Sequence, residues 1–127
     1  MDLRRGGGFL GYIMGGFDGF LYVLVTFVVI DYITGIMLAV IEKKLSSEIG
    51  FRGIFKKMLI FGLVGIGHMI DLQLIQNGSV IRTAVIFFYI SNEGISIIEN
   101  TTQIGLPVPN KLKDLLVQLK DKDEEEK

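Results

Sequence analysis

The sequence predicts an all-α membrane protein with three transmembrane helices, organised as a single domain over residues 1–127. Half of its residues are hydrophobic and the mean hydropathy is +0.49. These hydrophobic residues are concentrated in three long blocks, which is typical of integral membrane proteins and unlike a soluble globular chain. The length fits one domain.

The first block, residues 19–41, contains fourteen Leu, Ile, Phe or Val residues. At about 1.5 Å per residue, it is long enough to cross a hydrocarbon core of about 30 Å. Its apolar residues contribute roughly −4 to −8 kcal/mol to insertion, which exceeds the roughly 2.5 to 3.5 kcal/mol that a central Asp costs. We therefore expect this segment to insert despite Asp31.

Two further blocks, residues 58–75 and 80–98, each contain ten such residues and are interrupted by polar groups. The link between them is only "QNGS", and its Asn-Gly pair is a strong turn signal. These blocks therefore predict a tight hairpin of two membrane-spanning helices. We expect the more polar third span to insert with help from its neighbours.

The basic residues predict the orientation of the three spans. If the spans alternate in direction, three Lys and Arg residues lie on the side of the N-terminus and ten lie on the side of the 42–57 loop and the C-terminus. Because basic residues favour the cytoplasmic side, the N-terminus is expected outside and the C-terminus in the cytoplasm.

The two ends of the chain differ in character. Residues 1–18 are rich in glycine, and we expect this segment to be disordered or to lie at the membrane interface. Residues 107–127 form a charged tail that follows two prolines, and its leucines recur at helical spacing. This pattern predicts a short cytoplasmic amphipathic helix on the inner leaflet or against a partner helix. A solvated tail is the alternative. The leucines are Leu112, Leu115, Leu116 and Leu119.

The third span carries a row of polar residues at bilayer depth. On a helical wheel of about 100° per residue, seven of them share a sector of roughly 120°, while most Phe and Ile residues lie outside it. Polar groups at this depth face a bundle interior or water, and they indicate function by default. We call this row the polar stripe: Arg82, Tyr89, Asn92, Glu93, Ser96, Glu99 and Asn100.

The polar stripe has two interpretations. It lines a water-filled pore in an assembly of several copies, or it forms a buried polar network within one copy. The predicted spans contain four carboxylates but only one Arg and one His, so the carboxylates cannot all be paired within one copy. Unless some carboxylates are protonated, this count favours the pore. The carboxylates are those of Asp31, Asp71, Glu93 and Glu99.

Small residues on the first two spans predict close helix packing. Gly35 and Ala39 form a small-xxx-small pair, and the second span carries three spaced glycines. We assign to helix packing the residues Asp31, Gly35, Ala39, Gly62, Gly65, Gly67 and Asp71. His68 and Asp71 lie three residues apart, but without a third ligand they predict an interhelical hydrogen bond and no metal site.

The sequence contains no motif of known catalytic chemistry. It lacks a Walker loop, GxSxG and HExxH. Its glycine-rich stretch after Arg5 lacks the strand-to-helix context that a nucleotide-binding GxGxxG needs, and the chain has no cysteine for a thiolate nucleophile or a Cys-based zinc site. A net charge of −1 gives no reason to expect a nucleic-acid partner. We therefore expect no enzyme activity, no cofactor and no bound metal.

Three stretches resemble the family of phage lysis and toxin secretion holins, which includes the holin-like proteins of clostridial toxin loci. They are "DYITGIMLAVIEKKLSSEIGFRGIFKK", "RTAVIFFYISNEGISIIENTTQIGLPVPNKLKDLL" and the intervening Asp71. The combination of Asp-Tyr-x-Thr-Gly, the Ser-Ser-x-x-Gly-x-x-Gly loop with its Lys-Lys, and Asn-Glu-Gly-x-Ser-x-x-Glu-Asn before Gly-x-Pro-x-Pro carries the resemblance, which covers about residues 20–120.

The resemblance implies a holin, a membrane protein that forms large homo-oligomeric lesions in the cytoplasmic membrane of a bacterial host. The partners it implies are the lipid bilayer, further copies of the chain, an antiholin in some systems, and an endolysin or large toxin that passes through the lesion. Two alternatives remain open. In the first alternative, the chain is a small ion channel or an antiholin-type regulatory subunit. In the second, it is a membrane-anchored interaction protein whose C-terminal tail carries the activity.

Overall fold

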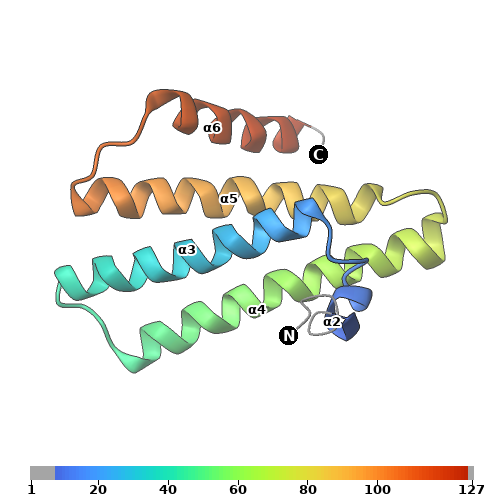
Figure 1. Ribbon diagram of the computed structural model, residues 1–127, viewed down its shortest axis with the longest axis horizontal. Helices are drawn as coiled ribbons and strands as arrows, with labels where there is room; N and C mark the ends of the chain where they lie inside the picture. The colour runs from blue at the N-terminus through green and yellow to red at the C-terminus, as the bar shows by residue number, and fades with distance from the viewer. Residues whose placement is uncertain (1–7, 126–127) are drawn as a thin grey trace.

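The computed structural model describes residues 8–125, with side chains to residue 119. Every regular element in this part of the chain is a helix (Figure 1). The elements are α2 (Gly8–Ile13), α3 (Gly19–Ile41), α4 (Ser47–Ile70), the π-helical turn η1 (Asp71–Ile75), α5 (Val80–Ile104) and α6 (Asn110–Glu125).

Three of the helices are long and apolar enough to cross a membrane, which confirms the prediction of an all-helical chain with three such spans. They cover Gly19–Ile41, Ser47–Ile75 and Val80–Ile104. The first has the predicted bounds. The second begins at Ser47, well before residue 58, and the third continues past residue 98, so the connection between α3 and α4 is shorter than the 42–57 segment.

Side-chain caps explain where the first two long helices begin. The Asp18 carboxylate accepts a hydrogen bond of 2.9 Å from the Leu21 N–H at the start of α3. The Ser46 hydroxyl accepts one of 3.2 Å from the Ile49 N–H at the start of α4. Such caps satisfy backbone donors that the first helical turn leaves without partners.

A tight hairpin joins α4 to α5. The chain leaves η1 through Gln76 and Gly78, which both have positive φ. The Asp71 carboxylate, only 2% exposed, then accepts hydrogen bonds from the Ile81 and Arg82 N–H groups at 2.9 and 2.8 Å. Because Asp71 caps α5 from the end of α4, the two helices are joined by a side chain as well as by the turn.

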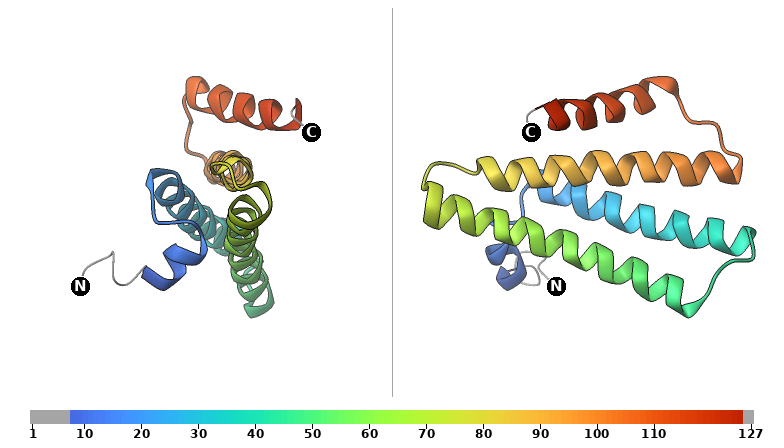
Figure 2. Two further views of the ribbon diagram at one scale, coloured as in Figure 1. Left: turned by 90° about the vertical axis from the view of Figure 1, so that its right-hand side faces the viewer. Right: turned by 180° about the vertical axis from the view of Figure 1, so that it is seen from behind.

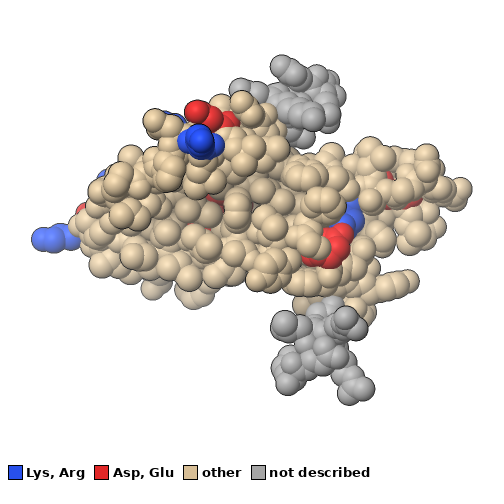
Figure 3. Space-filling model, turned by 45° about the horizontal axis from the view of Figure 1, so that its top comes forward, with Lys and Arg blue, Asp and Glu red and all other residues tan. Residues whose placement is uncertain are grey.

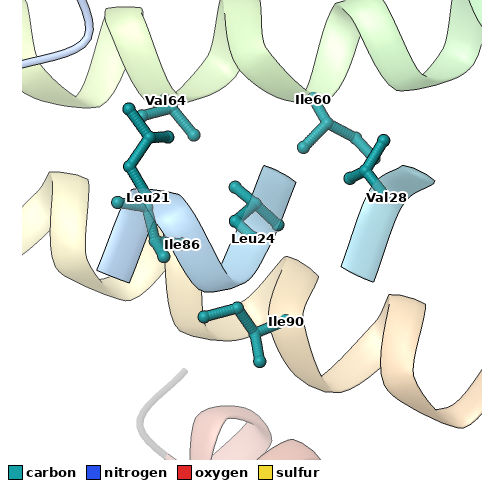
Figure 4. Packing of buried hydrophobic residues seen from close by; sticks show 7 residues of the cluster. All are labelled: Leu21, Leu24, Val28, Ile60, Val64, Ile86 and Ile90. Carbon is teal, nitrogen blue, oxygen red and sulfur yellow. The ribbon is translucent and has the colours of Figure 1, made fainter. Parts of the chain in front are cut away.

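The hydrophobic core lies where α3, α4 and α5 meet (Figure 4). Its buried residues are Leu21, Leu24, Val28, Ile60, Val64, Ile86 and Ile90. Towards Ile41 and Ser47, α3 and α4 diverge, while α5 stays alongside α3 (Figures 1 and 2). Most of the face in Figure 3 is uncharged, and many large hydrophobic side chains are exposed, as expected for a surface that meets lipid.

Helix α6 folds back along α5 (Figure 1). Leu116 is only 4% exposed and lies against Gly94 of α5. A Cβ atom on Gly94 would lie 2.9 Å from one Leu116 methyl carbon and 3.0 Å from a ring carbon of Phe27. The absence of a side chain at Gly94 therefore allows α3, α5 and α6 to meet.

Gly67 allows α4 and α5 to approach closely, and its replacement is predicted to destabilise the hairpin. A Cβ atom there would lie 3.1 Å from the Arg82 Cα, which is backbone and cannot move aside cheaply. We expect Gly67→Ala to lower the free energy of unfolding in detergent micelles by about 1 to 3 kcal/mol relative to Gly62→Ala. Gly62 is the matched control because a Cβ atom there would have nothing within 4 Å. Equal stability of the two variants would contradict the close contact.

Candidate functional site

The central cluster is a set of buried and half-buried polar side chains inside the bundle: Asp31 of α3, Lys57 of α4, and Glu93 and Asn100 of α5. The Lys57 ammonium donates hydrogen bonds to Asp31 Oδ2 at 2.7 Å and to Glu93 Oε2 and Oε1 at 3.0 and 3.2 Å. The three side chains are 17%, 9% and 8% exposed, in the order Lys57, Asp31, Glu93. One ammonium therefore joins all three long helices.

Asn100 extends the central cluster towards the end of α5. Its side-chain amide donates to Asp31 Oδ1 at 3.2 Å and to the Thr34 hydroxyl at 3.1 Å. Both carboxylate oxygens of Asp31 consequently have a partner. Among the described residues, no buried side-chain nitrogen or oxygen lacks one.

The charged members of the central cluster lie at one depth. Asp31 is ten residues from Ile41, Lys57 is ten residues from Ser47, and Glu93 is eleven residues from Ile104. At about 1.5 Å per residue, each lies about 15 to 17 Å from the helix end on the same side of the bundle. That is close to the middle of a hydrocarbon core of about 30 Å.

Lys57 is a site residue that the sequence pattern did not predict. Because residue 57 was expected in the 42–57 loop, only Arg82 and His68 were counted as cations that could pair with the four carboxylates of the spans. The structure adds a third cation, because α4 begins at Ser47 and carries Lys57 into the bundle. The signal in the sequence was Ser46, a favourable N-cap residue directly before the pattern of apolar residues.

The hairpin cluster lies at the other end of the bundle and consists of Asp18, Asp71 and Arg82. Arg82 is only 3% exposed, and its guanidinium donates to Asp18 Oδ2 and the Gly16 carbonyl, both at 2.8 Å, and to the Met14 carbonyl. The Arg82 backbone N–H is held by Asp71. This one arginine therefore fixes the segment before α3 against the start of α5.

Asp18 is the second site residue that was not predicted. Burial raises the pKa of its carboxyl group, but the hydrogen bonds from Arg82 and from the Leu21 N–H outweigh burial, so the pKa lies below its ordinary value. The signal was again an N-cap residue before an apolar run.

Gly15, at φ +91, fits beside Arg82 and His68, and a Cβ there would lie 2.6 Å from Arg82 Nε and 2.8 Å from His68 Nδ1.

The polar stripe therefore does not face one environment. Arg82, Glu93 and Asn100 turn into the two clusters. Tyr89 and Ser96 are half-buried. Asn92 and Glu99 are exposed on the outer face of α5. The stripe divides into an inward part that joins the helices of one copy and an outward part that stays open on that copy's surface.

The residues assigned to helix packing lie in different surroundings. Asp31 belongs to the central cluster and Asp71 to the hairpin cluster. A Cβ atom on Gly35 would lie 3.7 Å from Asn100, and one on Gly65 would lie 3.5 Å from Ile13. Gly67 lies against Arg82. Ala39 is half-buried, and Gly62 is exposed.

Neither cluster is arranged as a metal site. Within the described residues, no group of three or more His, Cys, Asp or Glu residues could hold a metal ion. The clusters instead provide ion pairs and hydrogen bonds, the central cluster near the middle of the spans and the hairpin cluster at one end of them.

Comparison with known proteins identifies the family. The model of the bacteriophage holin family matches residues 8–121, which includes every residue of both clusters. The chain belongs to the bacteriophage holin family. Holins are generally non-enzymatic membrane proteins, in agreement with three helices that can span a membrane.

Several relatives of this holin-family chain are uncharacterised proteins of Listeria, Clostridium and Bacillus species. One from Listeria innocua is 47% identical over 95% of this chain and 87% of its own length. A 14.9 kDa protein encoded in the nagH 3' region of Clostridium perfringens is 45% identical, over 87% of this chain and 84% of its own length. A Bacillus subtilis protein is 37% identical over 91% and 81%. No solved structure matches the chain.

Lys57 is predicted to be the residue on which the stability of the central cluster depends. We expect Lys57→Met to lower the free energy of unfolding in micelles by about 3 to 5 kcal/mol, because it leaves two buried carboxylates without their cation. Lys56→Met is the matched control, since Lys56 is exposed and has no ion pair with another described residue.

A neutral version of the central cluster tests whether pairing, rather than side-chain volume, is responsible. The triple variant Asp31→Asn, Lys57→Met, Glu93→Gln removes every charge together and should recover most of the stability that Lys57→Met loses. If Lys57→Met and Lys56→Met unfold at the same denaturant concentration, the ion pairs do not stabilise the bundle.

Proposed function

We propose that this protein is a holin that assembles from many copies into large lesions in the cytoplasmic membrane of a bacterial host. The lesions release a cell-wall hydrolase, or a large toxin, and lead to lysis. The bacteriophage holin family match and the three helices that can span a membrane support this proposal. In the proposed orientation the N-terminus is outside, and the cytoplasmic side holds the connection between α3 and α4 and the Ile104 end of α5, where the chain continues towards α6.

The outward part of the polar stripe is the observation that carries the proposal. Asn92 lies near the middle of α5, and Asn92 and Glu99 are both exposed on a helix that can span the membrane. Lipid tails offer no hydrogen-bond partner, so the Asn92 amide near mid-span is left unsatisfied in lipid, while Glu99 lies nearer the end of the span. An assembly removes the Asn92 amide from lipid.

This arrangement supports assembly above a threshold concentration. Association of copies is favoured by mass action, so lesions form only after enough protein has accumulated. We propose that Asn92 and Glu99 leave lipid first, at the boundary between copies and lumen. Arg82, Glu93 and Asn100 contribute to the lumen only if the clusters that hold them open.

A small ion channel or an antiholin-type regulatory subunit is the second candidate. The observation that favours it is the complete pairing of the buried polar side chains among the described residues, which gives one copy a closed and stable bundle. Such a protein would need no large assembly. The size of the molecules that cross the membrane separates the two candidates.

The test is to induce the protein in bacteria that contain a cytoplasmic reporter enzyme of tens of kilodaltons, while a dye reports the membrane potential. We expect abrupt release of the reporter after a delay. Loss of the potential with the reporter retained would support the small channel. If neither reporter release nor loss of the potential occurs at any expression level, both candidates are excluded.

The double variant Asn92→Leu, Glu99→Leu is predicted to insert at least as well as the original chain and to lose reporter release or delay it strongly. The reason is that the outer face of α5 no longer carries the Asn92 amide, which lipid cannot satisfy, so assembly gains less. Membrane fractionation measures insertion. The control is Ile66→Leu, Met69→Leu on the exposed face of α4, which should release the reporter at the original time. Release by the α5 variant at that same time would contradict the role of this face.

A further inference from the structure

We propose that the outer face of α5 binds α5 of a second copy, side by side and in parallel, through a seam of five residues. This inference rests on the proposed function, because it names the surface through which copies first associate. The seam consists of Phe88, Asn92, Ile95, Glu99 and Thr102.

The spacing of the seam fits helix pairing. Its residues follow one another at intervals of four, three, four and three positions. Apolar or polar residues repeated at such intervals lie along one side of a helix and match the same side of a second helix in a left-handed crossing. Phe88 and Ile95 supply the apolar positions, and Asn92 lies between them.

The seam is the face of α5 that its own copy leaves most open. Helices α3 and α4 contact the side that carries Arg82 and Glu93, and α6 contacts the side that carries Gly94. The end-on view in Figure 2 shows these three helices around α5. Asn92, Glu99 and Thr102 remain exposed, whereas Phe88 and Ile95 are half-buried.

Asn92 argues for a second copy as the occupant. A carboxamide has both donors and an acceptor, so two Asn92 side chains at equal depth satisfy each other across a two-fold axis. Copies inserted in one membrane with one orientation place Asn92 opposite Asn92. Hydrogen bonds of this kind between membrane helices contribute about 0.6 to 1.7 kcal/mol, and lipid cannot replace them.

Glu99 modulates the same seam. It lies five residues from the end of α5, about 7 to 8 Å along the helix, where headgroup water is close. Two Glu99 carboxylates facing each other repel, which opposes closure at this end. The seam should therefore close most tightly between Phe88 and Ile95, and Glu99→Gln should strengthen the pair.

The absence of cysteine from the chain allows a direct test in membranes. Ile95→Cys places a thiol in the seam at mid-depth, and Val29→Cys places a matched control on the exposed face of α3. On oxidation with copper phenanthroline, we expect a disulfide-linked dimer for Ile95→Cys and little for Val29→Cys. Adding Asn92→Leu to Ile95→Cys should lower the dimer association constant about 3- to 20-fold, and adding Glu99→Gln should raise it.

The outcomes separate this inference from the proposed function. If reporter release is normal but Ile95→Cys forms no more dimer than Val29→Cys, the proposed α5 interface is wrong and the proposed lesion-forming function is retained. If Ile95→Cys forms the dimer, Asn92→Leu weakens it, and no reporter is ever released, the pair stands and the lesion is wrong. A dimer that Asn92→Leu leaves unchanged would overturn the role of the amide.

Discussion

The structure depends on one constraint, which is that an ion at the middle of a bilayer must have a partner. Lys57 meets this constraint for two helices at once, because its ammonium lies 2.7 Å from Asp31 and 3.0 Å from Glu93. A one-residue shift of any long helix would rotate its charged group by about 100° away from the others. The ion pairs therefore set the register of the bundle, and the apolar core packs around that register.

The same constraint divides the polar residues of α5 by role. Groups that turn inward find partners within the copy, in the central cluster near mid-depth and in the hairpin cluster around Arg82. Asn92 and Glu99 turn outward and stay exposed. Under the proposed holin function, a chain with both kinds of group forms a stable bundle alone and gains from association, so it can accumulate before it assembles.

Much of the fold follows from local sequence signals. Residues 19–41 form a helix with the predicted bounds because a long apolar block with a single charged residue leaves little choice, and the Asn-Gly pair does mark the hairpin turn. The start of α4 was misplaced because its first turns are polar and basic and therefore do not stand out in a hydropathy pattern. The N-cap residue Ser46 indicates the correct start. The omission of Lys57 from the charge count followed from that boundary.

The division of the polar stripe was harder to predict, because it depends on how other helices surround α5. Asn92 and Glu93 are adjacent in sequence and about 100° apart on the helix, so a neighbour that buries one leaves the other open. A helical wheel places both in one sector, and only the positions of α3, α4 and α6 separate them. Asp18 likewise becomes a site residue through contact with Arg82, which is remote in sequence.

The most direct test is to detect the ion pairs of the central cluster in a lipid bilayer. Solid-state nuclear magnetic resonance of the protein in liposomes, with ¹⁵N in lysine and ¹³C in the side-chain carboxyl groups, reports which carboxyl carbons lie close to the Lys57 ammonium. We predict dipolar coupling from Lys57 to both Asp31 and Glu93, each lost when that partner is replaced. A Lys57 ammonium coupled to neither carboxyl group would contradict the register that these ion pairs set.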